Sequence, residues 1–112
     1  MESLDTTFSA LSDPTRRAIL ARLSGGEACV SDFVDTLHLS QPAITKHVQA
    51  LERAGLVARR RDRQRRPIRL RVEAMREAAN WFDFYRRFWD ESLDRLAVHL
   101  ESHERRQKET PE

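Results

Sequence analysis

Apolar residues recur every three or four positions through the first half of the chain, which is the repeat of helices with one buried face. The spacing predicts helices over residues 3–12, 14–24, 31–37 and 41–54. Residues that cap or stop helices flank these segments: Asp13, Ser31 and Ser40 before them, Gly25-Gly26 and Gly55 after them. The predicted core positions are Leu4, Phe8, Leu11, Ala18, Ile19, Leu20, Leu23, Phe33, Val34, Leu37, Ile44, Val48 and Leu51.

After Gly55 the pattern changes from a helical repeat to an alternation. Residues 56–61 and 68–72 favour two short strands, because Ile68, Leu70 and Val72 alternate with arginines. The intervening residues 62–67 form a predicted hairpin tip that is rich in arginine. An apolar piece at residues 28–30 is interpreted as a further short strand.

The last third of the chain predicts one long helix. No glycine or proline occurs from residue 73 to about residue 103, which corresponds to roughly 45 Å of helix. A heptad-like apolar stripe follows this segment: Ala78, Phe82, Tyr85, Trp89, Leu93, Leu96 and Leu100. A second, aromatic stripe lies beside it: Trp81, Phe84 and Phe88. Residues 105–112 are expected to form a polar tail that frays.

The length of 112 residues fits one domain, which we place at residues 1–104 and expect to be mostly α with a small β-hairpin. No apolar run approaches the roughly 20 residues that a membrane span needs. The first residues lack the basic start and apolar stretch of a signal peptide. The single cysteine, Cys29, has no intrachain disulfide partner. We therefore expect a cytoplasmic protein with no membrane partner.

Positive charge is concentrated in one segment. Residues 40–72 contain ten lysines and arginines against two acidic residues, whereas the rest of the chain is acidic and the whole carries +2. A cationic block of this kind suits a polyanion, because basic side chains displace counterions from phosphates. The alternative is a solvated arginine-rich loop without a partner.

A short helix, a tight turn and a second capped helix predict a helix-turn-helix over residues 31–54, and the basic hairpin after it, residues 56–72, predicts a wing. The second helix has one apolar face and one polar face, so the polar face is free to read base edges in the major groove. The predicted DNA-binding residues are Ser40, Gln41, Pro42, Thr45, Lys46, His47, Gln49, Arg63, Arg65 and Arg66. Their partner is double-stranded DNA.

Three segments resemble the ArsR family of bacterial winged-helix repressors. They are FSALSDPTRR at residues 8–17, SQPAITKHV at residues 40–48 and LERAGLV at residues 51–57. The resemblance covers about residues 4–72, with a compatible long helix after it. It implies a homodimer whose first and last helices pair across a two-fold axis. It also implies a repressor that binds an imperfect palindrome in a promoter, often its own.

The aromatic content of the last helix independently favours a dimer, since a lone chain of this size has few places to bury it. We expect the heptad stripe of the helix over residues 73–103 to face the partner and the second stripe to face the chain's own domain. The predicted dimer-interface residues are Leu4, Phe8, Phe82, Tyr85, Trp89, Leu93 and Leu96.

Many members of the ArsR family release DNA when a metal binds, often through a Cys-Val-Cys stretch. This chain has Cys29-Val30-Ser31 there, and one thiolate does not build a soft-metal site. His99 and His103 lie four apart on the last helix and are weak zinc candidates, so no metal or cofactor is predicted. Cys29 is either a redox switch or, as is commoner, a buried inert thiol.

Two other classes of function compete with a DNA-binding repressor. One is a winged-helix module whose basic surface docks an acidic protein, and the other is a metal-responsive form of the repressor. An enzyme is not predicted. The sequence has no glycine-rich phosphate loop, no paired metal-ligand motif and no nucleophile motif.

Overall fold

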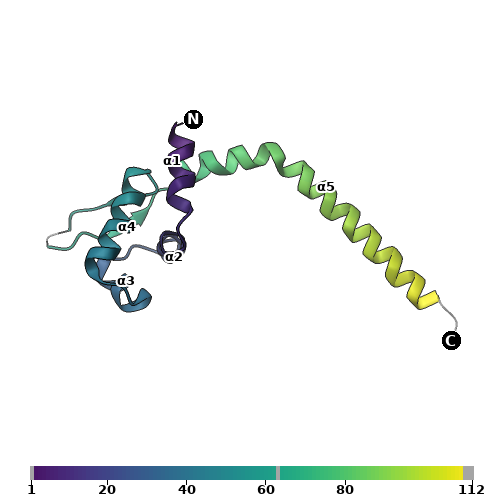
Figure 1. Ribbon diagram of the computed structural model, residues 1–112, viewed down its shortest axis with the longest axis horizontal. Coiled ribbons are helices and arrows are strands. Elements are labelled where there is room, and N and C mark those ends of the chain that lie inside the picture. The colour runs from purple at the N-terminus through teal and green to yellow at the C-terminus, as the bar shows by residue number, and fades with distance from the viewer. Residues whose placement is uncertain (1, 63, 110–112) are drawn as a thin grey trace. The chain divides into compact units, whose positions relative to one another are not determined.

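The computed structural model describes residues 2–62 and 64–109. The chain forms two compact units, Met1–Ala78 and Ala79–Glu112, and each is described by itself. The first unit holds four helices and a hairpin, and the second is the continuation of the last helix (Figure 1). The expectation of a mostly α chain with a small hairpin is confirmed.

The first two helices are α1 (Glu2–Leu11) and α2 (Pro14–Leu23). On α1 the fully buried side chains are Thr7 and Ala10, whereas the predicted core residues Leu4 and Phe8 are only half-buried. Small side chains let α1 approach its neighbours closely, which leaves the larger apolar residues at the edge of the core. Leu4 and Phe8 therefore keep apolar surface exposed in the single chain.

The helix-turn-helix consists of α3 (Val30–Leu37) and α4 (Gln41–Arg53). Its turn pivots on His38, whose φ of 56° is left-handed and whose N–H donates to the carbonyl of Val34. The prediction that Ser31 caps α3 is wrong, because the N-cap is Cys29. The Cys29 N–H donates to Asp32 Oδ2 at 2.8 Å. Ser31 has no acidic residue three positions later, so it lacks such a partner.

The core lies between α2, α3, α4 and the hairpin. The predicted inward residues of α4, Ile44, Val48 and Leu51, are all fully buried, as is Phe33 of α3. Since these side chains occupy one side of α4, its remaining positions lie at the surface of the unit. The rest of the buried apolar cluster comprises Ala10, Ile19, Leu20, Leu23, Ala28, Ala54, Leu56, Val57 and Ile68.

The wing is an antiparallel hairpin of β1 (Val57–Arg59) and β2 (Ile68–Leu70). Its register pairs Ala58 with Arg69 and Arg59 with Ile68. Both strands are shorter than predicted, and of the apolar piece at residues 28–30 only Ala28 pairs, through a single bridge to Ile68. The next residues after Ala28 already belong to the capped start of α3, so no third strand extends there.

The last helix, α5 (Glu73–Glu109), continues six residues beyond the predicted end near residue 103. An ion pair between Arg105 and Glu101, four residues apart at 3.9 Å, supports the added turns. The polar residues that were expected to fray are therefore helical as far as residue 109.

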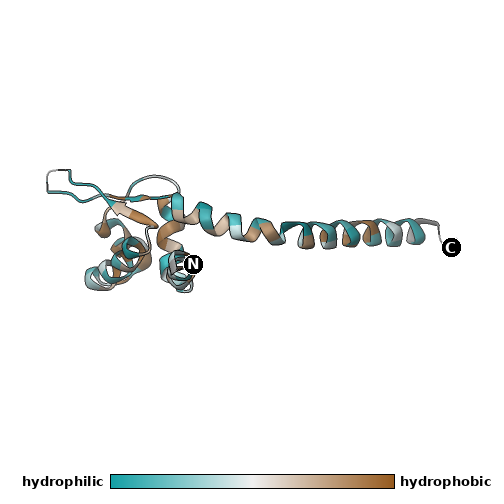
Figure 2. Cartoon of the chain, turned by 90° about the horizontal axis from the view of Figure 1, so that it is seen from above, coloured by the Kyte–Doolittle hydropathy of each residue, from teal (hydrophilic) through white to brown (hydrophobic). Residues whose placement is uncertain are grey.

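Within residues 79–112 the apolar side chains of both stripes are exposed. Phe84 and Phe88 of the second stripe are 72% and 60% exposed. The aromatic rings contact each other along the helix, as between Trp81 and Tyr85 at 5.0 Å between centroids. Figure 2 shows apolar and polar residues alternating along this helix.

Candidate nucleic-acid interface

The outer side of α4 is polar and accessible. Gln41, Pro42, Lys46 and Gln49 are exposed, and Thr45 is half-buried at the edge of the same side. The apolar residues of the helix point into the core, so core packing does not require these five predicted residues. Amide, hydroxyl and ammonium groups on one accessible helix face are the donors and acceptors that read base edges.

Ser40 holds the start of this helix. Its Oγ accepts a hydrogen bond from the Ala43 N–H at 3.3 Å, which satisfies one of the free donors of the first turn. The cap fixes where α4 begins, and thereby places Gln41 and Pro42 at its exposed N-terminal end. The Ser40 side chain itself is exposed, and its hydroxyl proton is available to a further acceptor.

His47 is half-buried and contacts the start of α2. Its Nδ1 accepts a hydrogen bond from Arg16 Nε at 3.3 Å and lies 4.0 Å from Asp13 Oδ1. Asp13 Oδ1 also accepts from the backbone N–H groups of Thr15 and Arg16 at 2.8 and 3.1 Å. This cluster links α4 to α2, and neither Asp13 nor Arg16 was predicted as part of the site.

The Asp13 carboxylate is stabilised by these hydrogen bonds. The backbone N–H of Arg16 is the largest influence that lowers the pKa of Asp13, and the N–H of Thr15 and the nearby side chains of His47 and Arg16 lower it further. Hydrogen bonds and positive charge favour the ionised form of an acid. The charged carboxylate therefore contributes to the stability of the unit.

We expect acid to weaken the unit through Asp13. Because its pKa is lower in the folded than in the unfolded chain, its contribution is complete above the ordinary aspartate pKa and is lost as the pH falls through the folded value. An Asp13→Asn variant keeps a capping side chain but no titrating group. Urea unfolding between about pH 6 and about pH 3 should show a smaller acid loss for the variant than for the wild type. Parallel pH curves would contradict this role.

The arginines of the wing differ in their exposure and in their pairing with acidic side chains. Arg65 and Arg66 are exposed near the hairpin tip, where Asp62 and Arg65 exchange two backbone hydrogen bonds of 3.1 and 3.0 Å. Arg63 lies outside the described residues. Arg60, by contrast, donates a hydrogen bond from Nη2 to Glu27 Oε2 at 2.9 Å, and this bond raises the pKa of the guanidinium. The exposed charges of the wing thus lie toward its tip.

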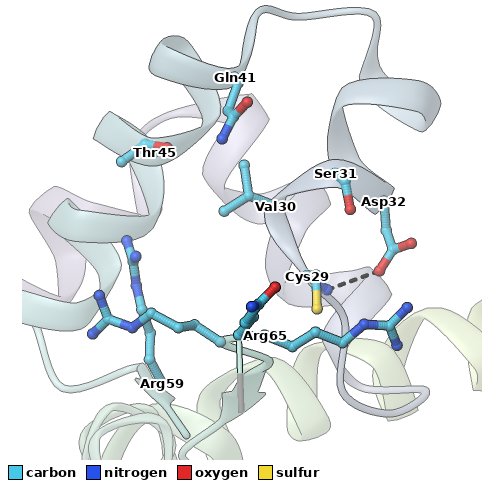
Figure 3. Close-up of a pocket in the computed structure, with 10 residues that line it drawn as sticks. Cys29, Val30, Ser31, Asp32, Gln41, Thr45, Arg59 and Arg65 are labelled. Carbon is cyan, nitrogen blue, oxygen red and sulfur yellow. Dashed lines mark hydrogen bonds between the residues drawn. The ribbon is translucent and has the colours of Figure 1, made fainter. Parts of the chain in front are cut away.

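Between the wing and the helix-turn-helix is a hollow of about 410 Å³ (Figure 3). Its walls come from three places: the start of α3, the polar side of α4, and the hairpin. The lining residues are Cys29, Val30, Ser31, Asp32, Gln41, Thr45, Arg59, Gln64, Arg65 and Arg66. The hollow therefore joins predicted base-reading residues to predicted phosphate-binding residues, together with Arg59, for which the sequence predicts only a place in a strand.

The weak zinc candidates on α5 have basic neighbours. His99 and His103 line a hollow of about 320 Å³ with Arg95 and Arg106. Among residues whose placement is described, no group of three or more histidine, cysteine or acidic side chains is arranged to hold a metal ion. In the same part of the chain, none of the helices is both long enough and apolar enough to cross a membrane.

The arrangement of a capped helix-turn-helix and a basic hairpin wing defines a winged-helix DNA-binding protein. Comparison with known families agrees: residues 13–59 match the family described as "Bacterial regulatory protein, arsR family". The transcriptional repressor SdpR of Bacillus subtilis is 32% identical over 78 residues, which cover 70% of this chain and 87% of the repressor.

Solved structures show the same similarity. The crystal structure of an ArsR family transcriptional regulator, RHA00566, superposes with a TM-score of 0.71 at 32% identity, over 80% of this chain and 92% of that chain. A homodimeric winged helix-turn-helix DNA-binding domain, Mb0332 from Mycobacterium bovis, gives a TM-score of 0.61 at 26% identity, over 84% of each chain. The chain belongs to the ArsR family, and it is a winged-helix transcriptional repressor rather than an enzyme.

Proposed function

We propose that this repressor acts as a homodimer on an imperfect palindrome in double-stranded DNA, with α4 of each protomer in a major groove. The observation that carries the proposal is that the exposed polar side of α4 opens directly into the arginine-bearing hollow beneath the wing. One continuous surface of the first unit thus offers both base-reading and phosphate-binding groups.

Each predicted residue has a role in this proposal. Gln41 and Gln49 hydrogen-bond base edges, Thr45 contacts a thymine methyl, and Lys46 reaches guanine or a phosphate. Ser40 and Pro42 set the N-terminal end of the helix against the DNA. His47, held by Asp13 and Arg16, positions α4 on α2 and faces the DNA backbone in this proposal. The exposed wing-tip arginines, with Arg63, bind backbone phosphates or a narrow minor groove.

Dimerisation is supported by apolar surface that the single chain leaves exposed. Phe82, Trp89 and Leu93 of the heptad stripe are 44%, 42% and 59% exposed, and Tyr85 and Leu96 lie on the same side of α5. Leu4 and Phe8 add half-buried surface on α1. A similar domain, the one from Mycobacterium bovis, is described as homodimeric. A two-fold pair would present two α4 helices to half-sites about 34 Å apart.

Selection from random duplexes tests the proposal directly. The purified protein should enrich fragments that contain two inverted half-sites about one helical turn apart. Binding of a selected duplex should persist at moderate salt, whereas binding of an unselected duplex should fall steeply. If no sequence is enriched and all duplex binding vanishes at moderate salt, the basic surface serves another partner, such as an acidic protein.

Removal of the wing-tip charges should weaken binding without changing what is read. An Arg65→Gln/Arg66→Gln double variant loses two predicted phosphate contacts per protomer, so the slope of log affinity against log salt should become shallower by up to about 1.8 per protomer. Affinity ratios between selected and random duplexes should stay nearly constant. Arg17→Gln/Arg22→Gln on α2 removes equal charge elsewhere and serves as the control. An unaltered slope in the wing variant would remove the tip from the interface.

A further inference from the structure

The wing carries an arginine on its inner face. In the β1–β2 register, Val57 and Arg59 of β1 share one side with Ile68 and Leu70 of β2, and Ala58 and Arg69 occupy the other. Val57 and Ile68 on that inner side are fully buried. Arg59 therefore extends from the end of the buried row, while Arg69 on the opposite face is exposed.

The guanidinium of Arg59 is largely buried, and it forms an ion pair with Glu52 but, within the described part of the chain, lacks hydrogen-bond partners at two of its nitrogens. Its side chain is only 13% exposed, and its Nε and Nη2 atoms are buried with no hydrogen-bond acceptor among the described residues. Glu52 Oε1 lies 3.7 Å from Nε, an ion-pair distance that is too long for a hydrogen bond. Buried donors without an acceptor cost free energy, so the ion pair with Glu52 leaves hydrogen-bonding capacity on Arg59 that a phosphate oxygen would satisfy.

That site is the hollow beneath the wing. Arg59 lines it together with Arg65, while Gln41 and Thr45 face it from α4 and Ser31 from α3 (Figure 3). Asp32 is the acidic side chain in the lining, and its Oδ2 already accepts the Cys29 N–H at 2.8 Å. The hollow thus presents arginine donors on one side and, on the others, an amide and hydroxyls that can also donate.

We infer that Arg59 anchors one phosphate group of the DNA backbone in this hollow. This inference rests on the proposed function and deepens it, because it assigns a contact at the base of the wing in addition to those at its tip. A guanidinium carries several donors for phosphate oxygens, and the backbone of Arg59 is held by the hairpin before DNA arrives. The contact fixes the wing against α4 and so sets the register of Gln41 and Thr45 on the bases.

The salt dependence of binding to a selected duplex tests the inference. Arg59→Gln should make the slope shallower by about 0.9 per protomer and weaken binding at least tenfold, whereas Arg59→Lys should keep most of the slope. Arg69→Gln removes the same charge from the outer face of the same hairpin and should change the slope by less than half as much. Equal effects of Arg59→Gln and Arg69→Gln would show that only net charge matters and would overturn the inference.

A chemical cycle locates the contact on the DNA. Single phosphates of the selected duplex are replaced by uncharged methylphosphonates, one position at a time. In the wild type one position per half-site should weaken binding, and the same replacement should have little further effect in Arg59→Gln. Additive losses at every position would contradict the contact. Thermal unfolding of the variants shows whether each of them is folded. A folded Arg59→Gln protein with an unchanged salt slope refutes the inference outright.

Two further results separate its possible failures. If the wild type binds no duplex at all, the proposed function fails and not only the role of Arg59. If inorganic phosphate stabilises the wild type but not Arg59→Gln against thermal unfolding, yet displaces the selected duplex no more than chloride does at matched ionic strength, the hollow holds a free anion rather than the DNA backbone. Preferential displacement by phosphate in the wild type but not in Arg59→Gln supports the backbone, because the two phosphates then compete for one site.

Discussion

A Leu93→Glu variant is expected to be monomeric at concentrations where the wild type is a dimer. Leu93 is 59% exposed in the single chain and belongs to the heptad stripe of α5. In a two-fold seam the substitution would bury two unpaired carboxylates, which costs several kcal/mol. The dimer dissociation constant should rise by more than about a hundredfold, as measured by light scattering coupled to size exclusion.

Val98→Glu provides the matched control for this variant. Val98 is 62% exposed, and it lies nine residues from Trp89, which places the two half a turn apart on the helix. The same apolar-to-acidic change there should leave the dimer intact. Trp89→Glu should behave like Leu93→Glu. A dimer that persists in both stripe variants would mean that the chain associates through another surface.

The loss of the dimer should also remove most of the affinity for DNA. Two linked half-site contacts bind far more tightly than one, because the second contact forms within the complex. The monomeric variant should therefore bind a full palindrome no better than a single half-site. Circular dichroism should show that α1–α4 remain folded, since their buried cluster does not include Leu93.

A Gln41→Ala variant is expected to lose sequence preference more than affinity in general. Gln41 is exposed at the first turn of α4 and faces the hollow beneath the wing. One bidentate contact to a base contributes about 1–3 kcal/mol of discrimination, so affinity for the selected duplex should fall roughly 5- to 150-fold per protomer. Affinity for a random duplex of equal length should barely change. Both affinities are measured in one titration series at fixed salt.

Lys46→Ala should show the same direction if Lys46 reads guanine. Lys46 is exposed one turn further along α4. A phosphate contact would instead lower both affinities by similar factors and reduce the salt slope. Equal losses on the selected and random duplexes for both Gln41→Ala and Lys46→Ala would show that these side chains touch only the backbone. Base reading would then have to come from Thr45, Gln49 or the shape of the DNA.

Local patterns in the sequence were enough to predict the elements of the first unit. The apolar repeat over Ile44, Val48 and Leu51 identified the buried side of α4, and the same residues are fully buried in the structure. Ser40 and Gly55 marked the bounds of that helix, since caps and left-handed stops act within one turn. The polar side of α4 followed directly, because a helix with one buried face exposes the other.

Contacts between distant segments were decided only by the tertiary structure. The sequence showed ten basic residues between 40 and 72, but not that Arg60 pairs with Glu27 or that Arg59 turns inward beside Ile68. A one-residue change in strand register would have exchanged the faces of Arg59 and its neighbours, and short strands carry little local information about register. The linkage of His47 to α2 depends likewise on how two helices pack.

The sequence by itself therefore determined which segments form helices and wing, and that positive charge gathers on the winged helix-turn-helix. Capping, hydrophobic period and strand alternation are all properties of neighbouring residues, so they can be read along the chain. Only the tertiary structure decided which arginines are paired, exposed or buried, because partners such as Glu27 and Arg60 lie far apart in the sequence. The hollow that contains Arg59 exists only once α3, α4 and the hairpin have packed together.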